Sequence, residues 1–462
     1  MHKVIINGET EYAKDGTLLS DLLIESGKGV DHHCGGRGTC RKCVITVNGK
    51  EELSCQYIIK SDISVVIPQN GEIVSETGAI ETGKLTENLC FSLDIGTTTL
   101  ALALVSLDEG KIIKVITRTN PQCAFGADVM TRIDYCCKNG VDKLQKAVIS
   151  EINSMISEFN LQSIEKLYVS GNATMLHFFF GIDCSSMGVA PYTPEFLESK
   201  TEKAENLGII GIETVESLPS IAAFVGADIV AGLNFVGTPE SNKHNLLIDL
   251  GTNAEIVLFS EKSALCTAAA AGPCFEGANI SCGMSATSGA VYSFSEAKIK
   301  TISDAPAKGI CGTGLVDIIA YLLDKEIIDD TGYMEDDFEI AEDVCINQAD
   351  IRQYQLAKSA VYSAIITLVQ MKNITFDDID KMYISGGFSA KINIENAVKT
   401  GLLPKELKNK CIAIKNSSLL GTVKYACEKN DLAIYIDNST YVDLSANPAF
   451  SDLFIENMMF EV

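Results

Sequence analysis

The sequence is short of positive charge. Its 462 residues include 37 lysine and arginine residues against 61 aspartate and glutamate residues, which gives a formal net charge of −24 at pH 7. Nucleic-acid phosphates attract basic surfaces, so this balance argues against a nucleic-acid-binding protein. It favours a cytoplasmic protein that docks with a neutral or positively charged partner.

The chain also lacks a long uninterrupted apolar segment. The best candidate, LPSIAAFVGADIVAGLNFVG at residues 218–237, contains Pro219 and Asp228. It therefore predicts a buried helix with a functional or capping carboxylate rather than a membrane span. The N-terminus, MHKVIINGETEY, alternates as a strand does and has no apolar signal-peptide core. We expect no membrane partner and a cytoplasmic location.

Two common nucleotide-binding motifs are missing. There is no G-x-x-x-x-G-K-[ST], which excludes a P-loop, and no G-x-G-x-x-G after a strand, which leaves a dinucleotide fingerprint unsupported. Any nucleotide site must therefore be built from other elements.

What the sequence does contain is arranged in three parts. Residues 1–70 read as short strands and one helix separated by glycine turns, and residues 71–88 have the composition of a flexible linker. Residues 89–462 read as an α/β domain. Strand–turn–strand patterns open at residues 89 and 245, and each is later followed by a helix and a strand, which predicts two similar halves at about 89–244 and 245–462.

Four cysteines stand in the pattern C-x5-C-x2-C-x11-C: Cys34, Cys40, Cys43 and Cys55. Glycines in the same loop allow tight folding with amide hydrogens directed at the sulfurs. Zinc sites usually have two C-x2-C pairs, and only one is present. The spacing resembles that of plant-type or adrenodoxin-like ferredoxins, so we expect a β-grasp, ferredoxin-like α+β domain with a 2Fe–2S cluster.

This loop has other interpretations. A zinc or structural cysteine cluster is the main alternative. His32 and His33 would suit a Rieske-like site, but four cysteines already suffice. The letters DHHC also occur in lipid transferases, which need membrane helices that this chain lacks.

Two Asp-x-Gly-Thr turns, SLDIGTTTLALALV and LIDLGTNAEIVLF, each follow an apolar strand. Such turns offer amides and hydroxyls to phosphates and a carboxylate to Mg²⁺. With YISGGFS they resemble the superfamily of acetate and sugar kinases, heat-shock chaperones and actin. The resemblance implies a duplicated actin-like ATPase domain with three sets of site residues. They are the first phosphate loop (Asp94, Gly96, Thr97, Thr98), the second (Asp249, Gly251, Thr252, Asn253) and the adenosine contact (Gly386, Gly387).

Asn253 departs from the glycine or small residue usual in that superfamily. The alternative for both turns is a pair of ordinary strand hairpins that bind no nucleotide.

The combination of a ferredoxin head and an ATP-binding body resembles the reductive activators of corrinoid proteins, with further similar stretches such as GNATMLHFFFGI and AGPCFEGANISCGM. The resemblance implies transfer of one electron from the cluster to the Co(II) corrinoid of a methyltransferase system, coupled to ATP and Mg²⁺. The implied partners are that corrinoid protein and an external low-potential electron donor. A homodimer is expected from the resemblance alone.

Three other functions stay open. An activator of radical dehydratases shares the kinase-like body but lacks a ferredoxin head. A small-molecule kinase would leave the cysteine cluster without a role. A redox-sensing nucleotide-binding protein would not reduce a corrinoid.

Overall fold

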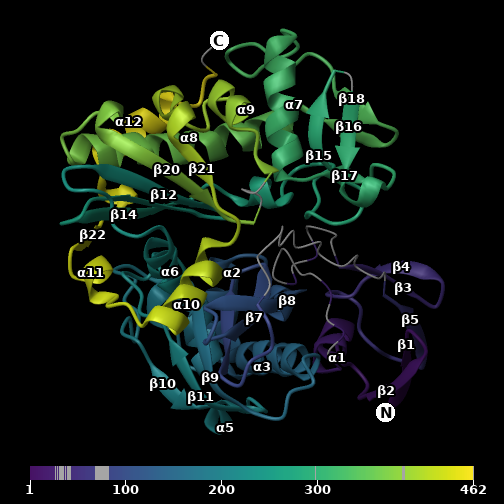
Figure 1. The fold of residues 1–462 in the computed structure, drawn as a ribbon. Coiled ribbons are helices and arrows are strands. Elements are labelled where there is room, and N and C mark those ends of the chain that lie inside the picture. The colour runs from purple at the N-terminus through teal and green to yellow at the C-terminus, as the bar shows by residue number, and fades with distance from the viewer. Residues whose placement is uncertain are drawn as a thin grey trace. The chain divides into compact units, whose positions relative to one another are not determined.

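The computed structural model describes residues 1–26, 28, 30, 36, 38, 43–67, 83–296, 298–387 and 391–460 (Figure 1). These residues form two compact units. The first runs to Leu218, and the second begins at Pro219 and also includes residues 83 and 110–112. The units therefore divide at residue 218, whereas the repeated sequence pattern opens at residue 245.

The N-terminal domain is a five-stranded β-grasp sheet with one helix, as the sequence predicts. Its strand order is β2-β1-β5-β3-β4, with β1 and β5 parallel. Asn7–Gly8 and Asn48–Gly49 adopt positive φ and make the two tight hairpins, so the single strand expected at residues 3–10 is split. The elements are β1 (His2–Ile6), β2 (Glu9–Ala13), α1 (Leu19–Glu25), β3 (Val44–Val47), β4 (Lys50–Leu53) and β5 (Ile63–Val66).

The rest of the first unit is built on a six-stranded sheet of order β10-β11-β9-β6-β7-β8. The sheet opens with the antiparallel series predicted from residues 89–120, and β9 then pairs parallel to β6. The elements are β6 (Leu89–Ile95), β7 (Thr99–Ser106), β8 (Lys111–Thr119), α2 (Val129–Asn139), α3 (Asp142–Ser157), β9 (Ile164–Gly171), α4 (Ala173–Phe180), β10 (Thr201–Lys203), α5 (Ala204–Leu207) and β11 (Ile212–Ser217).

The second unit repeats this plan in a six-stranded sheet of order β21-β20-β12-β13-β14-β22. Strands β12, β13 and β14 are antiparallel, and β20 pairs parallel to β12 as β9 does to β6. The sheet elements are β12 (His244–Leu250), β13 (Ala254–Phe259), β14 (Ala264–Ala269), β20 (Ile379–Ser385), β21 (Cys411–Ala413) and β22 (Ser439–Tyr441). The shared topology confirms the duplicated α/β fold.

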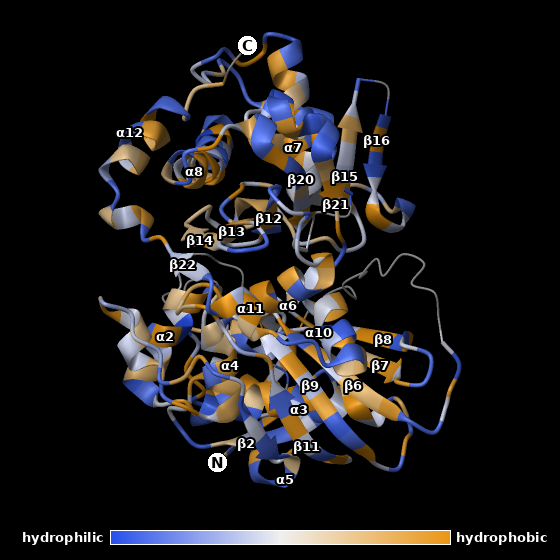
Figure 2. Cartoon of the chain, turned by 60° about the vertical axis from the view of Figure 1, so that its left-hand side comes forward, coloured by the Kyte–Doolittle hydropathy of each residue, from blue (hydrophilic) through white to orange (hydrophobic). Residues whose placement is uncertain are grey.

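Helices and two small sheets complete the second unit. The described residues of its largest apolar cluster come mainly from β12, β13, α7 and α8, and α3 and α7 show both orange and blue in Figure 2, as amphipathic helices do. The remaining elements are α6 (Ala227–Val236), β15 (Ala290–Ser295), β16 (Lys298–Thr301), β17 (Gly309–Ile310), α7 (Gly312–Asp324), β18 (Phe338–Ala341), β19 (Val344–Ile346), α8 (Gln348–Met371), α9 (Ile394–Lys399), α10 (Ser417–Glu428), α11 (Ala433–Ile436) and α12 (Pro448–Glu456).

The apolar stretch 218–237 is helical only over α6. Pro219 and Gly226 precede the helix, and Asp228 lies in its first turn, where its Oδ1 accepts a hydrogen bond from the Ile229 amide at 2.9 Å. The helix is therefore shorter than expected, and its N-cap is Gly226, which makes no side-chain capping hydrogen bond, so Asp228 is an acidic residue of the first turn and not the N-cap. Across the part of the chain that the structure describes, no helix is both long and apolar enough to cross a bilayer.

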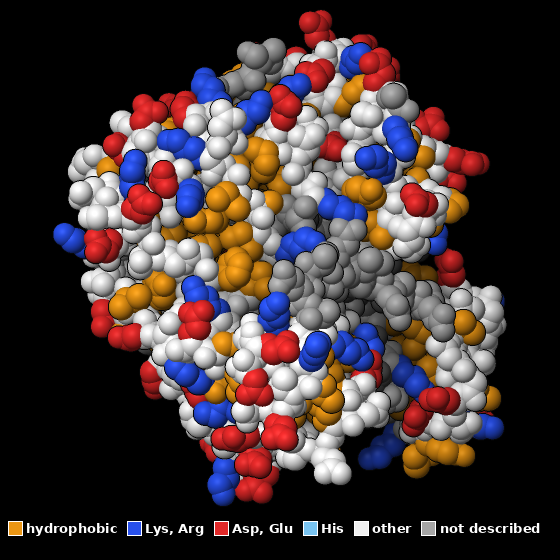
Figure 3. Space-filling model, in the orientation of Figure 1, with side chains coloured by type: hydrophobic (Ala, Val, Ile, Leu, Met, Phe, Trp, Pro, Cys, Tyr) orange, Lys and Arg blue, Asp and Glu red, His pale blue; other side chains and the backbone are white. Residues whose placement is uncertain are grey.

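The excess of acidic residues is dispersed on the face drawn in Figure 3. Asp and Glu side chains there alternate with Lys and Arg side chains. The net charge of −24 is therefore not gathered into one block on that face.

Candidate functional site

Two of the four predicted cluster cysteines lie in the described part of the N-terminal domain. Cys43 directly precedes β3 and Cys55 follows β4, and both side chains are buried in the domain core. Their sulfur atoms are 3.3 Å apart and form no disulfide. Cys34 and Cys40 lie outside the described residues.

The spacing of these sulfurs is closer to that of two ligands on one metal than to that of a disulfide. A disulfide would bring them to about 2.05 Å, whereas two thiolates on one tetrahedral metal with bonds of about 2.3 Å lie about 3.8 Å apart. Gln56, which the sequence analysis did not single out, donates from Nε2 to the Gly36 carbonyl at 2.7 Å and to Cys55 Sγ at 3.7 Å. The donor set fits an iron–sulfur cluster, whose potential responds to hydrogen bonds at the sulfurs.

The first predicted phosphate loop is the hairpin between β6 and β7. Asp94 lies near the end of β6, and the Gly96 amide donates to the Thr99 carbonyl at 2.9 Å. A Cβ on Gly96 would lie 2.8 Å from that carbonyl oxygen, so the turn requires glycine. Thr97 and Thr98 occupy the tip and are partly exposed.

Two asparagines that the sequence analysis did not assign hold this hairpin. Asn120 donates from Nδ2 to the Gly96 carbonyl and from its amide to the Thr98 carbonyl, both at 2.8 Å. Asn172, the N-cap of α4, donates from Nδ2 to Thr97 Oγ1 at 3.1 Å. Asn172 lies in GNATMLHFFFGI, one of the stretches noted for their resemblance, but the contacts of both asparagines depend on tertiary folding.

The second predicted phosphate loop is the hairpin between β12 and β13. Asp249 lies opposite Glu255, and the Gly251 amide donates to the Asn253 carbonyl at 2.9 Å. The loop between Leu250 and Ala254 is one residue shorter than its counterpart between Ile95 and Leu100. Asn253, which replaces the glycine or small residue usual in the superfamily, thus lies in a tighter turn.

A carboxylate that the sequence analysis missed binds this hairpin. Glu276, at the end of the 3-10 helix Pro273–Glu276, accepts a hydrogen bond at Oε1 from the Thr252 amide at 2.9 Å. A Cβ on Gly251 would lie 3.2 Å from the same oxygen. The loop amide thus already binds an anionic oxygen.

Carboxylates gather around Glu255. Desolvation raises the pKa of its carboxyl well above the ordinary value. The neighbouring carboxylates raise that pKa further: Asp228, Asp249 and Glu276. Mg²⁺ prefers carboxylate and phosphate oxygens, so this arrangement fits Mg²⁺ bound together with a nucleotide.

The predicted adenosine glycines follow β20, beside the second hairpin. Asp249 pairs with Ser385, and a Cβ on Gly386, whose φ is +109°, would lie 2.1 Å from the Leu250 carbonyl oxygen. A Cβ on Gly387 would meet no atom within 4 Å. Position 386 therefore requires glycine because the backbone of Leu250 lies so close, whereas a side chain at position 387 would meet no neighbouring atom.

The first unit contains the equivalent junction. Asp94 pairs with Ser170 and Ile95 with Gly171, where a Cβ would lie 2.7 Å from the Ile95 carbonyl oxygen. In each sheet, a Ser-Gly sequence at the end of a parallel strand therefore lies beside the Asp-x-Gly hairpin: Ser170–Gly171 in the first unit and Ser385–Gly386 in the second. Within each unit the predicted residues lie together.

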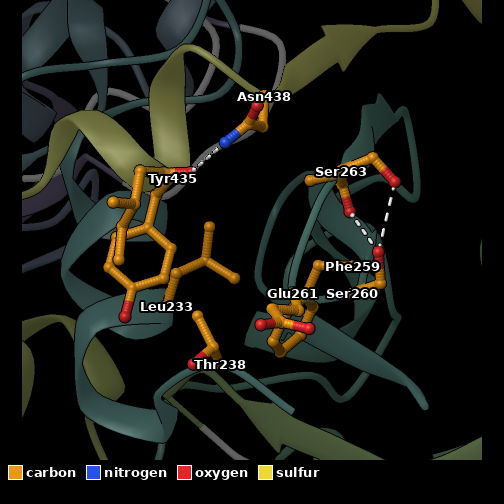
Figure 4. Close-up of a pocket in the computed structure, with 10 residues that line it drawn as sticks. Leu233, Thr238, Phe259, Ser260, Glu261, Ser263, Tyr435 and Asn438 are labelled. Atoms are coloured by element: carbon orange, nitrogen blue, oxygen red, sulfur yellow. Dashed lines mark hydrogen bonds between the residues drawn. The ribbon is translucent and has the colours of Figure 1, made fainter. Parts of the chain in front are cut away.

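A surface pocket in the second unit lies away from this chemistry (Figure 4). Its walls include Leu233, Phe259 and Tyr435. Phe259 is four residues along β13 from Glu255, about 13 Å at 3.3 Å per residue. Glu261 is the only carboxylate in its lining, and no Lys, Arg, His or Cys side chain lies beside it there, so the pocket offers no catalytic set.

Three protein-family models match the chain. The 2Fe-2S iron-sulfur cluster binding domain matches residues 4–62, the RACo middle region residues 89–240, and the C-terminal domain of RACo, the ASKHA domain, residues 243–462. The chain belongs to the RACo family. RACo-family membership indicates a 2Fe–2S cluster in the N-terminal domain and ATP with Mg²⁺ in the actin-like domain.

Named relatives agree with this assignment. The chain is 26% identical to the corrinoid activation enzyme RamQ of Eubacterium limosum, over 96% of both chains. It is 26% identical to the [Co(II) methylated amine-specific corrinoid protein] reductase of Methanosarcina barkeri, over 74% of this chain and 70% of that one. The solved reductive activator for corrinoid, iron-sulfur protein superposes with a TM-score of 0.73 at 28% identity, covering 100% of this chain and 98% of that one.

Proposed function

We propose that this RACo-family protein is an ATP-dependent reductive activator, which passes one electron to the Co(II) corrinoid of a methyltransferase system and regenerates Co(I). The observation that carries the proposal is the union in one chain of a cysteine ligand set and two Asp-Gly hairpins on duplicated sheets. The relatives named above are activators or reductases of corrinoid proteins.

The described residues have separable tasks in this proposal. Cys43 and Cys55 hold the cluster with Cys34 and Cys40, and Gln56 donates a hydrogen bond beside it. The amides and hydroxyls of the two hairpins hold the phosphates. Asp94 and Asp249 hold Mg²⁺, and the backbone at Gly386 and Gly387 lies against the adenosine.

The requirement for ATP follows from the potentials. When bound, the cluster supplies a one-electron couple, which for plant-type centres lies near −400 mV. The Co(II)/Co(I) couple lies lower, and a gap of about 200 mV costs about 5 kcal/mol, since 59 mV corresponds to roughly 1.4 kcal/mol. Tighter binding of the Co(I) form offsets this cost, and ATP resets the complex rather than phosphorylating a substrate.

A reconstituted reaction tests the proposal. The protein is mixed with a low-potential chemical reductant, a Co(II) corrinoid protein and MgATP, and Co(I) is followed by visible absorption. We expect Co(I) to form only with ATP, and Asp94→Asn or Asp249→Asn to slow it by about 100-fold, the usual scale for one lost electrostatic contact.

The control is Asp134→Asn, which removes an exposed carboxylate of α2 paired with Lys138 and should leave the rate unchanged. Undiminished ATP dependence in both hairpin variants would refute the nucleotide assignment. Formation of Co(I) without ATP would refute the coupling. The natural electron donor and a homodimer remain part of the proposal, to be checked by donor exchange and by light scattering.

A further inference from the structure

Two cysteines of the second unit lie in contact although they are far apart in sequence. The amide of Cys345 donates to Cys282 Sγ at 3.4 Å, and the two side chains share a hydrogen bond. Neither residue belongs to the cluster ligands or to the hairpins. Both are free thiols and both are partly exposed.

Strand geometry explains this exposure. Cys345 is the central residue of β19, and its neighbours Val344 and Ile346 are 2% and 0% exposed. Side chains alternate along a strand, so Cys345 points to the opposite face from these core residues. There it meets Cys282 in the segment that follows Glu276.

Other close cysteine pairs among the described residues differ from this one. Cys136 and Cys184 also share a side-chain hydrogen bond but are 2% and 0% exposed, so reagents in solution do not reach them. Cys43 and Cys55 are assigned to the cluster. The Cys282–Cys345 pair is thus the accessible one in the described part of the chain.

We propose that Cys282 and Cys345 form a redox modification site, at which hydrogen peroxide converts the two thiols to a reversible disulfide. The Cys282 thiolate attacks one peroxide oxygen, giving a sulfenic acid and, with a proton, one water. The Cys345 thiol then attacks that sulfur, the S–S bond forms, and a second water leaves. Both sulfurs are oxidised by one electron each, and the peroxide is reduced by two.

The contacts assign the order of these steps. Cys282 Sγ accepts a hydrogen bond from the Cys345 N–H at 3.4 Å and donates one to the Asp343 carbonyl at 3.7 Å, so this sulfur is held in place beside Cys345. Desolvation, and then Cys282 itself, raise the pKa of Cys345. A raised pKa disfavours the Cys345 thiolate, so Cys345 suits the resolving role.

The surrounding structure already holds the two partners together. Ser281, next to Cys282, donates from its amide and Oγ to the buried Asp350 carboxylate at 2.7 and 3.1 Å. Asn347 Nδ2 donates to Ser281 Oγ at 2.6 Å. The disulfide would therefore tie the segment after Glu276 to the β18–β19 hairpin without a large rearrangement. This site does not depend on the proposed function.

Peptide mapping tests the proposal directly. Anaerobically purified holoprotein is treated with hydrogen peroxide, quenched with catalase, alkylated and digested without reductant. We expect a cross-linked peptide containing Cys282 and Cys345, about 2 Da lighter than its two reduced parts because two hydrogens are lost. Dithiothreitol should restore both thiols to alkylation.

Three variants make the result specific. Cys282→Ser and Cys345→Ser should each abolish the cross-linked peptide, whereas Cys427→Ser, which removes another partly exposed thiol, should leave it unchanged. Overoxidation of Cys282 with Cys345 still alkylated would overturn the proposal. So would an equal yield of disulfides between Cys282 and other cysteines.

Discussion

At the scale of single residues, a backbone amide of the second predicted phosphate loop already binds a carboxylate of the protein. The Thr252 amide donates to Glu276 Oε1 at 2.9 Å, as a backbone amide in an anion-binding turn would donate to a phosphate oxygen. A nucleotide phosphate must therefore displace this carboxylate or share the turn with it. In either case the negative charge of Glu276 opposes the phosphate unless a cation lies between them.

Glu276→Gln tests this competition because the amide side chain keeps the shape and loses the charge. With EDTA present, we expect ATP to bind about fivefold more tightly, which is about 1 kcal/mol, the repulsion between two unit charges about 4 Å apart in water. Isothermal titration calorimetry of the holoprotein measures the dissociation constant. With Mg²⁺ present the gain should shrink, since the cation screens the same charge.

The matched control is Glu261→Gln, a carboxylate beyond the other end of β13. It should not alter ATP binding. Weaker or unaltered ATP binding by Glu276→Gln in EDTA would show that the carboxylate does not compete with phosphate.

At the scale of elements, local sequence patterns predicted most of what the structure contains. Apolar periodicity found β6, β7, β8, α3 and α8, and the repeated Asp-Gly turns found the duplication. The prediction of a buried helix over residues 218–237 was only partly correct, because Pro219 and Gly226 precede the helix, which begins at Ala227. A periodic apolar signal does not distinguish a buried loop from a buried helix.

The contacts around the hairpins were not predictable in the same way. Asn120, Asn172 and Glu276 come to the turns from 24, 75 and 24 residues away. Nothing in their local sequence fixes which turn they reach, since that depends on the pairing of β9 with β6 and on the packing of the segment after β14. The hairpin residues were predictable from the sequence because the aspartate, the glycine and the polar residues of each site lie in one short turn.

Helices α6 and α10 cross at unusually short range. A Cβ on Gly421 of α10 would lie 1.8 Å from the Ala231 carbonyl oxygen of α6, whereas a Cβ on Gly232 would meet the flexible Leu247 Cδ2 and Ser417 Oγ at 3.0 Å. We expect Gly421→Ala to lower the free energy of unfolding by about 3 kcal/mol, because backbone must move.

Denaturant titration of both alanine variants checks this expectation. Gly232→Ala should change stability much less, since side chains can adjust and alanine favours the helix by about 1 kcal/mol. If the two variants were equally stable, close backbone approach would not be what holds this crossing.

At the scale of the whole molecule, the chain joins an electron carrier to a nucleotide switch through a short connection. The predicted cysteine ligands belong to residues 1–67, and the hairpins lie on two sheets that begin after residue 88. The predicted flexible linker covers residues 71–88, of which residues 71–82 lie outside the described part. Among the described ones, the Lys84 amide donates to Glu109 at 3.0 Å and Thr86 Oγ1 bonds Ser106 Oγ at 2.8 Å, so the end of the predicted linker is held against the sheet. Such a tether holds its domain at an effective concentration of about 1 mM.

Cleavage of the predicted linker tests whether ATP-dependent reduction of the corrinoid needs the N-terminal domain to be tethered to the ATP-binding part. A protease site is placed within residues 71–82 of the full-length protein, and the purified holoprotein is cleaved. We expect iron content and ATP binding to remain, because each depends on its own part. At about 1 µM protein, ATP-dependent formation of Co(I) should fall by at least about 100-fold, as the effective concentration drops from millimolar to micromolar.

The uncut protein with the same site is the control, and raising the concentration of the freed N-terminal domain should restore the rate. Full activity of the cut protein at 1 µM would mean that the tether does not deliver the electron carrier.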